Sequence, residues 1–350
     1  MNILITGGCG FLGSNIASDY LLDGARVTVV DKMFKSGSWE NLRWLQGLCR
    51  HDHDLVFCEA DVSLYDCLED VFVKQGPFDY ICHLAGQVAM TTSLADPIGD
   101  FRTNALGTLN LLDLSRRRSP DAFIAFSSTN KVYGDLKFLD YAESETRYSL
   151  PGFPNGIDES MPLDFASPYG CSKGSADQYV RDWYRNFGLK TVVFRHSSIY
   201  GGRQYATVDQ GWVGWFTMKA IEQARSLEKH EPLIPFTISG TGKQVRDVLH
   251  SRDLISLYRT AYEKRNSCAG EVFNIGGGVE NSMSLLELLD RLKNLLGLSQ
   301  SLVYEKLPRR QSDQDYFVAD ISKAKRLLGW APQVESTHGL QLMIEWIRAK

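Results

Sequence analysis

Runs of apolar residues alternate with segments of helical periodicity along the N-terminal part of the chain. Residues 97–118 and 169–187 show the helical period most clearly. Near-continuous apolar strands that alternate with helices are typical of a parallel sheet covered on both faces. The pattern therefore predicts an α/β fold with a doubly wound parallel sheet, in which ligands bind outside the carboxyl ends of the strands. The predicted strands span residues 2–6, 26–31, 54–60, 78–84, 122–128 and 191–197.

The C-terminal part of the chain is less regular, with two short strands expected near residues 236–239 and 272–275. We therefore expect residues 1–200 to form the sheet domain. Residues 201–350 should form mainly a smaller, partly discontinuous substrate domain, with part of 236–280 returning to the sheet. The helices expected in this part span residues 210–225, 252–264, 284–296 and 337–349.

A long segment, residues 135–166, lies between the end of a predicted strand and the start of a predicted helix. It is rich in proline, glycine and acidic residues. Loops of this length are usually functional or disordered. Because the segment leads directly to the helix at residues 169–187, we expect it to form a wall or lid of the site at the sheet edge.

Composition narrows the possible partners. The formal net charge of -4 argues against a nucleic-acid or anionic-membrane surface, because phosphate binding requires clustered lysines and arginines. No apolar run is long enough to span a bilayer. The seven cysteines are scattered without a CxxC pair, as in a reducing compartment, so we expect neither disulfides nor a metal site. Since the chain begins with a predicted strand and not with a leader, we expect it in the cytoplasm.

Three glycines after the first predicted strand form a dinucleotide-binding fingerprint. Gly7, Gly10 and Gly13 occupy the turn into a helix, with Phe11 and Leu12 between the last two. Glycines at these places allow a tight turn, a close approach of the backbone to a pyrophosphate, and close packing of helix on strand. The motif therefore predicts that the helix N-terminus faces the pyrophosphate of a dinucleotide.

Asp31 ends the second predicted strand, 18 residues after Gly13. A carboxylate at this place accepts hydrogen bonds from the adenosine ribose hydroxyls and repels a 2′-phosphate. We therefore assign residues 1–200 as a Rossmann domain that binds NAD and not NADP. Lys32 and Lys35 nearby are expected to be solvated.

The ends of the third and fourth predicted strands add further candidate contacts to the cofactor. Asp61 fits a contact to the adenine edge, although a helix cap explains this residue equally well. His83 is expected to be a packed, hydrogen-bonded histidine and not a catalyst. The cofactor contacts expected at these two strand ends are Asp61, Val62, Leu84, Ala85 and Gly86.

Tyr169 and Lys173 form a YxxxK pair at the start of a predicted helix. Residues four apart share a helix face, so the ammonium can lower the pKa of the phenol and favour a phenolate that accepts a hydroxyl proton. A second YxxxK, from Tyr133 to Lys137, follows a strand end in a glycine-containing loop, where the two residues need not meet. Thr129, at the end of the preceding strand, is expected to orient the substrate hydroxyl, with a turn cap as the alternative.

These motifs, taken together, resemble the extended short-chain dehydrogenase/reductase family of nucleotide-sugar enzymes, from the first predicted strand to the last helix. The resemblance implies that Asn104, Tyr169, Lys173 and His196 complete the NAD site. It also implies a nucleotide-diphosphate sugar as substrate. The motifs that carry it are residues 6–13, Asp31, Asp61, Val62, residues 83–86, Asn104, residues 127–129, Tyr169, Lys173 and residues 244–247.

Family members commonly pair through a four-helix bundle, which implies a homodimer or homotetramer here. The helices at residues 97–118 and 169–187 would form the bundle. Members that dehydrate sugars carry an Asp-Glu pair directly after the catalytic Ser or Thr, whereas this chain has Asn130 and Lys131. Without an acid and a base at these places, elimination is disfavoured.

Longer runs resemble those members of the family that invert C2 of CDP-linked sugars. The resemblance implies NAD-dependent epimerisation at C2 of a CDP-linked hexose, of the CDP-paratose to CDP-tyvelose type, with either a 3,6-dideoxyhexose or an ordinary hexose as substrate. Tyr169 would remove the hydroxyl proton while the hydride passes to tightly bound NAD, which is regenerated each turnover. The runs are residues 83–93, 128–134, 143–148, 154–156, 167–174, 194–204 and 209–216.

The expected substrate contacts are less specific than the catalytic motif. Arg246 has a structural ion pair as its alternative, and Arg203 is balanced between the two interpretations. A UDP-sugar 4-epimerase is the main enzymatic alternative. A dinucleotide-sensing regulatory protein on the same fold is the other, although such proteins usually lack the Tyr/Lys pair. The residues expected to bind substrate are Thr129, Ser198, Arg203, Gln210, Arg246 and Arg310.

Overall fold

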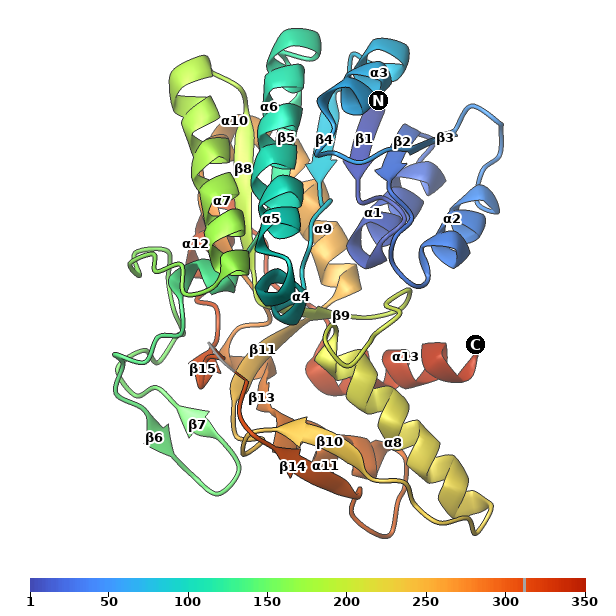
Figure 1. The fold of residues 1–350 in the computed structure, drawn as a ribbon, viewed down its shortest axis with the longest axis vertical. Helices are drawn as coiled ribbons and strands as arrows, with labels where there is room; N and C mark the ends of the chain where they lie inside the picture. The colour runs from blue at the N-terminus through green and yellow to red at the C-terminus, as the bar shows by residue number, and fades with distance from the viewer. Residues whose placement is uncertain (311–312) are drawn as a thin grey trace.

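A seven-stranded, wholly parallel sheet forms one half of the molecule in a computed structural model that describes residues 1–310 and 313–350 (Figure 1). The strand order is β12-β8-β5-β4-β1-β2-β3. The α/β prediction is confirmed, and the strands end within two residues of the predicted bounds. The strands are β1 (Asn2–Thr6), β2 (Arg26–Asp31), β3 (Leu55–Glu59), β4 (Tyr80–His83), β5 (Phe123–Thr129), β8 (Thr191–His196) and β12 (Val272–Ile275).

Helices cover both faces of this sheet, which explains why its strands are apolar on both sides. Each face buries its own apolar cluster, one that includes Ile16, Leu42 and Leu254 and another that includes Leu111 and Val180. The first cluster packs α1 (Phe11–Leu22), α2 (Ser38–Gln46) and α9 (Ser251–Glu263). The second packs α3 (Tyr65–Gln75), α6 (Gly107–Arg118) and α7 (Pro168–Phe187).

Several segments of the C-terminal half belong to this sheet domain, among them α9 in the first cluster. Strand β12 pairs with β8, as expected for part of residues 236–280, whereas β10 (Phe236–Ser239) stays in the smaller domain. Helix α12 (Ser322–Leu328) also joins the first cluster through Ala324, Leu328 and the following Trp330. The chain therefore crosses repeatedly between the domains, and the division at residue 200 remains a prediction.

The smaller domain lies below the carboxyl ends of the sheet strands in Figure 1. Its own apolar cluster includes Phe216, Met283 and Leu340. No helix in the described part of the chain has the length and apolar character of a membrane span. The strands of the smaller domain are β9 (Ser198–Tyr200), β10, β11 (Val245–His250), β13 (Ser282–Ser284), β14 (Tyr304–Leu307) and β15 (Tyr316–Phe317). Its helices are α8 (Trp212–Glu228), α11 (Leu285–Leu295) and α13 (Ser336–Arg348).

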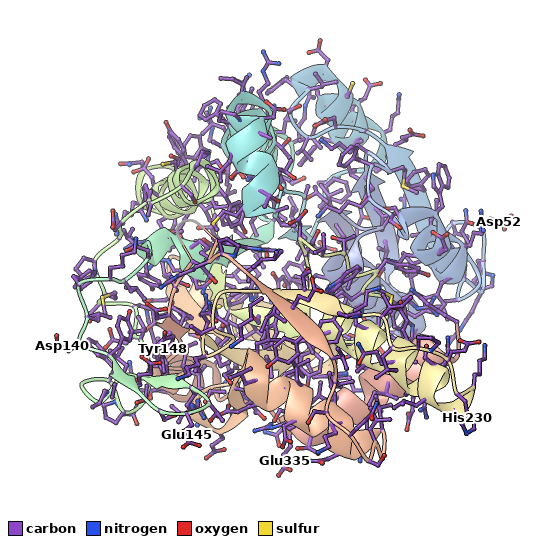
Figure 2. The ribbon with its side chains drawn as sticks, turned by 60° about the horizontal axis from the view of Figure 1, so that its bottom comes forward. Asp52, Asp140, Glu145, Tyr148, His230 and Glu335 are labelled. Carbon is purple, nitrogen blue, oxygen red and sulfur yellow. The ribbon has the colours of Figure 1, made fainter. Side chains whose placement is uncertain are left out.

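The insert at residues 135–166 packs against both domains. Its buried residues Leu136, Ile157 and Met161 pack against Phe317. The hairpin of β6 (Ala142–Glu143) and β7 (Tyr148–Ser149) projects from the surface, where Figure 2 shows Asp140, Glu145 and Tyr148 near its margin. The inner part of the insert is therefore a packed wall, whereas its hairpin lies at the surface.

A buried ion pair fixes α7 against the sheet. The guanidinium of Arg195 on β8 donates to both carboxylate oxygens of Asp177 on α7, each at 2.9 Å. Ser128 on β5 donates to the same carboxylate at 2.8 Å. Arg195 also donates to the Tyr133 hydroxyl, which in turn donates to Asn274 on β12. The network thus joins α7 to the carboxyl ends of three neighbouring strands.

Substituting Asp177 should destabilise the fold strongly. An Asp177→Asn variant leaves the buried Arg195 without a counter-charge, and breaking a buried pair in this way typically costs about 3–5 kcal/mol. Urea unfolding followed by circular dichroism measures the loss. The control is Asp70→Asn, since Asp70 and Lys74 form an exposed pair on α3, whose loss should cost less than about 1 kcal/mol. Equal losses in the two variants would show that the buried pair does not hold α7.

Candidate active site

The turn after β1 has the geometry of a dinucleotide fingerprint. Gly7 has a positive φ of 69°, and its amide donates to Val30 O at 2.7 Å. A Cβ on Gly7 would lie 2.8 Å from the Ala85 nitrogen, and one on Gly13 would collide with the Gly7 carbonyl. Only glycine therefore fits these two places. Because α1 begins at Phe11, its free amides face the space beyond the sheet edge, where they can bind an anion.

Asp31 lies beside this turn at the end of β2. Its carboxylate accepts from the Cys9 amide at 3.1 Å and from the Met33 amide at 2.9 Å. Burial raises the pKa of Asp31, and these amide donors act against that shift. At the end of β3, Asp61 accepts from the Ser63 amide and pairs with Lys32 at 3.3 Å. Asp61 therefore closes a turn before α3 and is not the helix cap itself.

The backbone after β4 is held beside Lys173 by Asn104. Asn104 lies in the π-helical turn η1 (Arg102–Leu106), which interrupts the single helix predicted there. Its side chain accepts from the Gln87 amide at 2.9 Å and donates to Gln87 O and to Ser172, both at 3.0 Å. A Cβ on Gly86 would lie 3.0 Å from Asn104 and 3.9 Å from the Lys173 ammonium. The predicted contacts Ala85, Gly86, Asn104 and Lys173 thus come together. The amide of the neighbouring Leu84 donates a hydrogen bond to Thr6 O. Val62 is buried in the second apolar cluster.

Tyr169 and Lys173 lie one turn apart at the start of α7. Ser167 caps the helix by accepting from the Gly170 amide at 3.0 Å. The Lys173 ammonium donates to Ser127 O at 2.5 Å and lies 4.2 Å from the Phe126 ring centre. The Thr129 hydroxyl hydrogen-bonds the Tyr169 phenol. Strand β5 and helix α7 therefore present one phenol, one hydroxyl and one ammonium together.

Burial sets the electrostatics of this trio. It raises the pKa of Tyr169 to about 12, against the hydrogen bond from Thr129. The expected lowering of this pKa by Lys173 is therefore not found in the structure. It lowers the pKa of Lys173 to about 7, although Asp177 and Asp100 both act to raise it. A cation bound nearby would favour the phenolate form of Tyr169. The arrangement suits a tyrosine that exchanges a proton with a hydroxyl held by Thr129.

The second YxxxK pair is structural. The Tyr133 hydroxyl is engaged by Arg195 and Asn274, as described above, whereas Lys137 forms an exposed ion pair with Asp135. Tyr133 lies in the short helix η2 (Asn130–Tyr133), and the chain turns at Gly134 before it reaches Lys137. The two side chains therefore share no helix face.

Two buried histidines stand near the site, and both are neutral. Thr6 and Thr108 contact the two ring nitrogens of His83 at 2.6 and 3.0 Å, so the expectation of a packed, hydrogen-bonded histidine is confirmed. His196 ends β8 and stacks on Tyr258. Burial, followed by the charge of Lys173, lowers the pKa of each histidine to about 3.

Arg246, on β11, forms the structural ion pair that the sequence left as its alternative. Its guanidinium donates to Asp313 at 2.8 Å and to Gln314 O at 2.9 Å. Arg310 donates to Val208 O at 3.0 Å. Ser198 on β9 accepts from the Trp212 indole at 3.0 Å. These side chains belong to the smaller domain or to its connections.

Arg203 and Gln210 lie on a loop that Arg310 also contacts, through Val208 O and Asp209. The guanidinium of Arg203 stacks 4.0 Å from the Trp44 ring centre on α2, and Gln210 accepts from Lys35 at 3.3 Å. Their loop, residues 201–211, is also held by Asn15 and Asn41, which donate to its carbonyls at 3.0 and 3.4 Å. The loop is therefore a strap across α1 and α2, beside the glycine turn.

Sequence reasoning assigned no role at the site to two polar residues, Lys131 and Gln314. In the sequence, Lys131 stood out only because it replaces an acidic residue of the dehydratases. In the structure, its ammonium pairs with Asp313 at 3.5 Å. Gln314 accepts from Asn130 at 3.0 Å and donates to Gly134 O at 2.7 Å. The only available signal was the Asp-Gln-Asp run that follows two arginines at residues 309–310. Within residues 1–310 and 313–350, no cluster of three or more His, Cys, Asp or Glu side chains could hold a metal ion.

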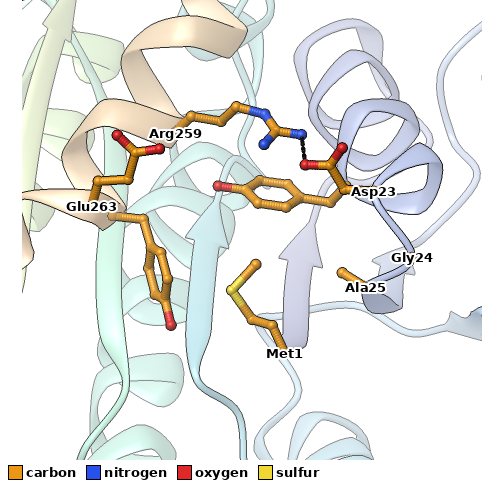
Figure 3. Close-up of a pocket in the computed structure, with 8 residues that line it drawn as sticks. Met1, Asp23, Gly24, Ala25, Arg259 and Glu263 are labelled. Carbon is orange, nitrogen blue, oxygen red and sulfur yellow. Dashed lines mark ion pairs between the residues drawn. The ribbon is translucent and has the colours of Figure 1, made fainter.

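The cavity in Figure 3 is not this site. It has a volume of about 290 Å³ and is lined by Met1, Tyr20, Ala25 and Arg259, among others. Met1 precedes β1, so the cavity opens at the amino ends of the strands. Arg259 is neutralised there by its ion pairs with Asp19 and Asp23.

Comparison with known proteins places the chain among nucleotide-sugar enzymes. The family model described as GDP-mannose 4,6 dehydratase matches residues 4–343. CDP-paratose 2-epimerase from Salmonella typhi is 51% identical over 346 residues, which cover 99% of each chain. A dTDP-glucose 4,6-dehydratase from Escherichia coli is 31% identical and covers 99% of this chain and 93% of its own. The solved UDP-glucose 4-epimerase from Thermotoga maritima, with UDP-glucose, has a TM-score of 0.81 at 31% identity over 100% of this chain and 99% of its own.

The depressed pKa of His83 predicts a pH-dependent stability. Its pKa is about 3 in the folded chain, against the ordinary histidine value of 6.5, so the unfolded chain binds one more proton between these values. Its contribution to stability is present above pH 6.5 and is lost as the pH falls. In urea unfolding between pH 4 and 6, His83→Gln should reduce the slope of unfolding free energy against pH by about 1.4 kcal/mol per unit. The exposed-residue control His51→Gln should keep the wild-type slope, and an unchanged slope in His83→Gln would contradict the assignment.

Proposed function

Because this chain belongs to the GDP-mannose 4,6-dehydratase family of nucleotide-sugar enzymes, we propose that it is an NAD-dependent epimerase that inverts C2 of a CDP-linked hexose. The conversion is of the CDP-paratose to CDP-tyvelose type. One observation carries the proposal: the Thr129, Tyr169 and Lys173 centre is followed by Asn130 and Lys131. The centre can exchange a hydroxyl proton, whereas residues 130 and 131 lack the carboxyl pair that serves as acid and base in an elimination.

The residues present at the sheet edge fit NAD. Gly7 and Gly13 leave room for a pyrophosphate at the start of α1, and Asp31 can accept from two ribose hydroxyls. Gly86 and the neutral His196 leave an uncharged surface near Lys173. When bound, NAD supplies the acceptor and then the donor of the hydride.

The chain's own residues handle the proton. Tyr169 accepts the C2 hydroxyl proton while the C2 hydrogen leaves as hydride, so that a 2-keto sugar forms. Thr129 holds the oxygen, and Lys173 stabilises the phenolate. The hydride then returns to the opposite face of C2, Tyr169 gives back the proton, and neither cofactor nor enzyme changes over the cycle.

The nucleotide diphosphate is assigned to the smaller domain. Arg246 and Arg310 supply cations, and Ser198 lines the adjoining edge of β9.

All seven cysteines are free thiols, which supports a cytoplasmic enzyme.

Exposed apolar side chains support pairing with a second copy of the chain. They include Ile98 and Phe101 on α5 (Pro97–Phe101), and Tyr179, Tyr184 and Phe187 on α7. A homodimer or homotetramer built on α5, α6 and α7 would cover them.

The identity of the inverted carbon tests the function. CDP-paratose, CDP-glucose and UDP-glucose are each incubated with the purified protein, and the products are read by NMR. We expect inversion at C2 of a CDP-linked sugar, without deuterium uptake from D₂O, because the same hydride returns. The likeness to UDP-glucose 4-epimerase favours inversion at C4 as the second candidate, and inversion only at C4 would overturn the proposal.

The matched variant for this test is Tyr169→Phe, which removes only the phenol oxygen. Loss of a general acid–base group typically lowers kcat by roughly 10²–10⁴-fold. The variant should retain its bound NAD, because the glycine turn and Asp31 are untouched. A variant with full turnover would show that another group moves the proton.

The strap at residues 201–211 should help to retain the cofactor. It crosses α1 and α2 beside Asp31, on the path by which a bound adenosine would leave. Replacing Arg203 by alanine removes its contact with Trp44, a cation–π interaction of about 1–2 kcal/mol. Dialysed Arg203→Ala protein should lose NAD roughly tenfold faster than wild type. The measurement is chromatography of the nucleotides released on denaturation.

Arg326→Ala, at an exposed arginine on α12, is the control for this experiment and should lose NAD at the wild-type rate. If Arg203→Ala also retained NAD like the wild type, the strap would have no part in holding the cofactor.

A further inference from the structure

A lysine lies two residues beyond the catalytic threonine, between Tyr169 and the arginine assigned to the diphosphate. The Lys131 amide donates to the Thr129 hydroxyl oxygen at 3.2 Å. At its other end, the Lys131 ammonium pairs with Asp313 at 3.5 Å, and the same carboxylate oxygen accepts from Arg246 at 2.8 Å. One residue therefore spans the distance between the proton-transfer group and the diphosphate contact.

The charges around Lys131 do not cancel. Lys131 and Arg246 share the single carboxylate of Asp313, and the neighbouring Arg309 is matched by Asp315 at 2.9 Å. This cluster therefore carries one positive charge more than its carboxylates balance. Such a surplus in a partly buried place favours the binding of an anion.

The Lys131 ammonium is also short of hydrogen-bond acceptors. Its nitrogen is buried, and among the described residues no acceptor has good hydrogen-bond geometry toward it. Burial lowers its pKa to about 8, with Asp313 acting to raise it and Arg246 to lower it further. A buried ammonium that lacks acceptors is costly, and a ligand oxygen would relieve the cost.

The chemistry of inversion at C2 explains why an anion would come so close to Thr129. In a nucleotide sugar, C2 is separated from the sugar-linked phosphate only by C1 and the glycosidic oxygen. When C2 lies at Tyr169, this phosphate must lie next to the catalytic threonine. When C4 lies at Tyr169 instead, the sugar ring separates the phosphate from the catalytic centre.

We propose that Lys131 binds the sugar-linked phosphate of the substrate and thereby presents C2, and not C4, to Tyr169. The inference rests on the proposed function, because it assigns the basis of that function's regiochemistry. Lys131 is a specificity-determining residue in this scheme and takes no part in proton transfer. Arg246 holds Asp313 in place and continues the cationic surface toward the nucleotide.

The test compares Lys131→Met with wild type by calorimetric titration of CDP and of CMP. CDP carries the second phosphate and CMP lacks it. The variant should bind CDP roughly tenfold more weakly, as expected for a lost charge-assisted hydrogen bond, while CMP binding stays within about twofold. Equal weakening for both nucleotides, or no weakening of CDP binding, would overturn the inference.

Two further variants separate charge from structure. Lys131→Arg keeps the cation and should recover CDP binding to within about threefold of wild type. Lys137→Met makes the same substitution at an exposed lysine a few residues away and should bind both nucleotides like wild type. Failure of Lys131→Arg to recover CDP binding would contradict a role for the positive charge.

The pH dependence of CDP binding gives a second readout, and its wild-type arm needs no variant. Wild-type affinity should fall as the pH rises from 7 to 9, because the ammonium loses its proton through a pKa near 8. Lys173 also titrates near this range, but it remains in Lys131→Met, so the difference between the two profiles belongs to Lys131. The charged groups that face Lys131 are Arg246, Arg309 and Asp313, and the neighbouring cations hold the pKa of Asp313 below its ordinary value. A flat wild-type profile would overturn the inference.

These measurements use binding alone, so they do not depend on the reaction catalysed. If wild type inverted no CDP-linked sugar at C2 but showed the CDP-specific loss in Lys131→Met, the proposed function would fail and the phosphate contact would stand. If wild type inverted C2 and the variant bound CDP normally, the function would stand and the inference would fail.

Discussion

The bidentate pair between Asp177 and Arg195 is the constraint on which the site depends. Asp177 lies on the same helix as Tyr169 and Lys173, two turns and one turn further along, so its pairing with β8 fixes where both proposed catalytic side chains lie. Ser128, which donates to the same carboxylate, immediately precedes Thr129. A buried pair adds little net stability over an apolar pair of the same shape, but it demands one geometry. Here that geometry aligns helix and strand so that a phenol, an ammonium and a hydroxyl meet.

The same burial that holds the elements together also tunes the titrating groups. Lys173 and Lys131 both have lowered pKa values, of about 7 and 8, because the protein around them replaces water. The neutral His83 and His196 add no competing charge. The sheet edge therefore presents poorly solvated cations, Lys173 and Lys131, near two neutral histidines. A negatively charged sugar nucleotide would satisfy them, and a positive nicotinamide would be balanced by the phenolate of Tyr169.

The sequence predicted the parts of the fold that follow from local pattern. The parallel strands were found to within two residues because burial on both faces makes them continuously apolar. Tyr169 and Lys173 were found because one helix carries both. The π-helical turn around Asn104 left no such pattern, since it depends on contacts with Gln87 and Ser172. The return of α12 to the sheet core was missed for the same reason.

Side chains that act across long sequence separations were the hardest to place. Arg203 has a φ of 69°, and its loop turns the guanidinium onto Trp44, which no spacing rule reveals. Lys131 and Asp313 are separated by most of the smaller domain, so a sequence motif shows only one of them at a time.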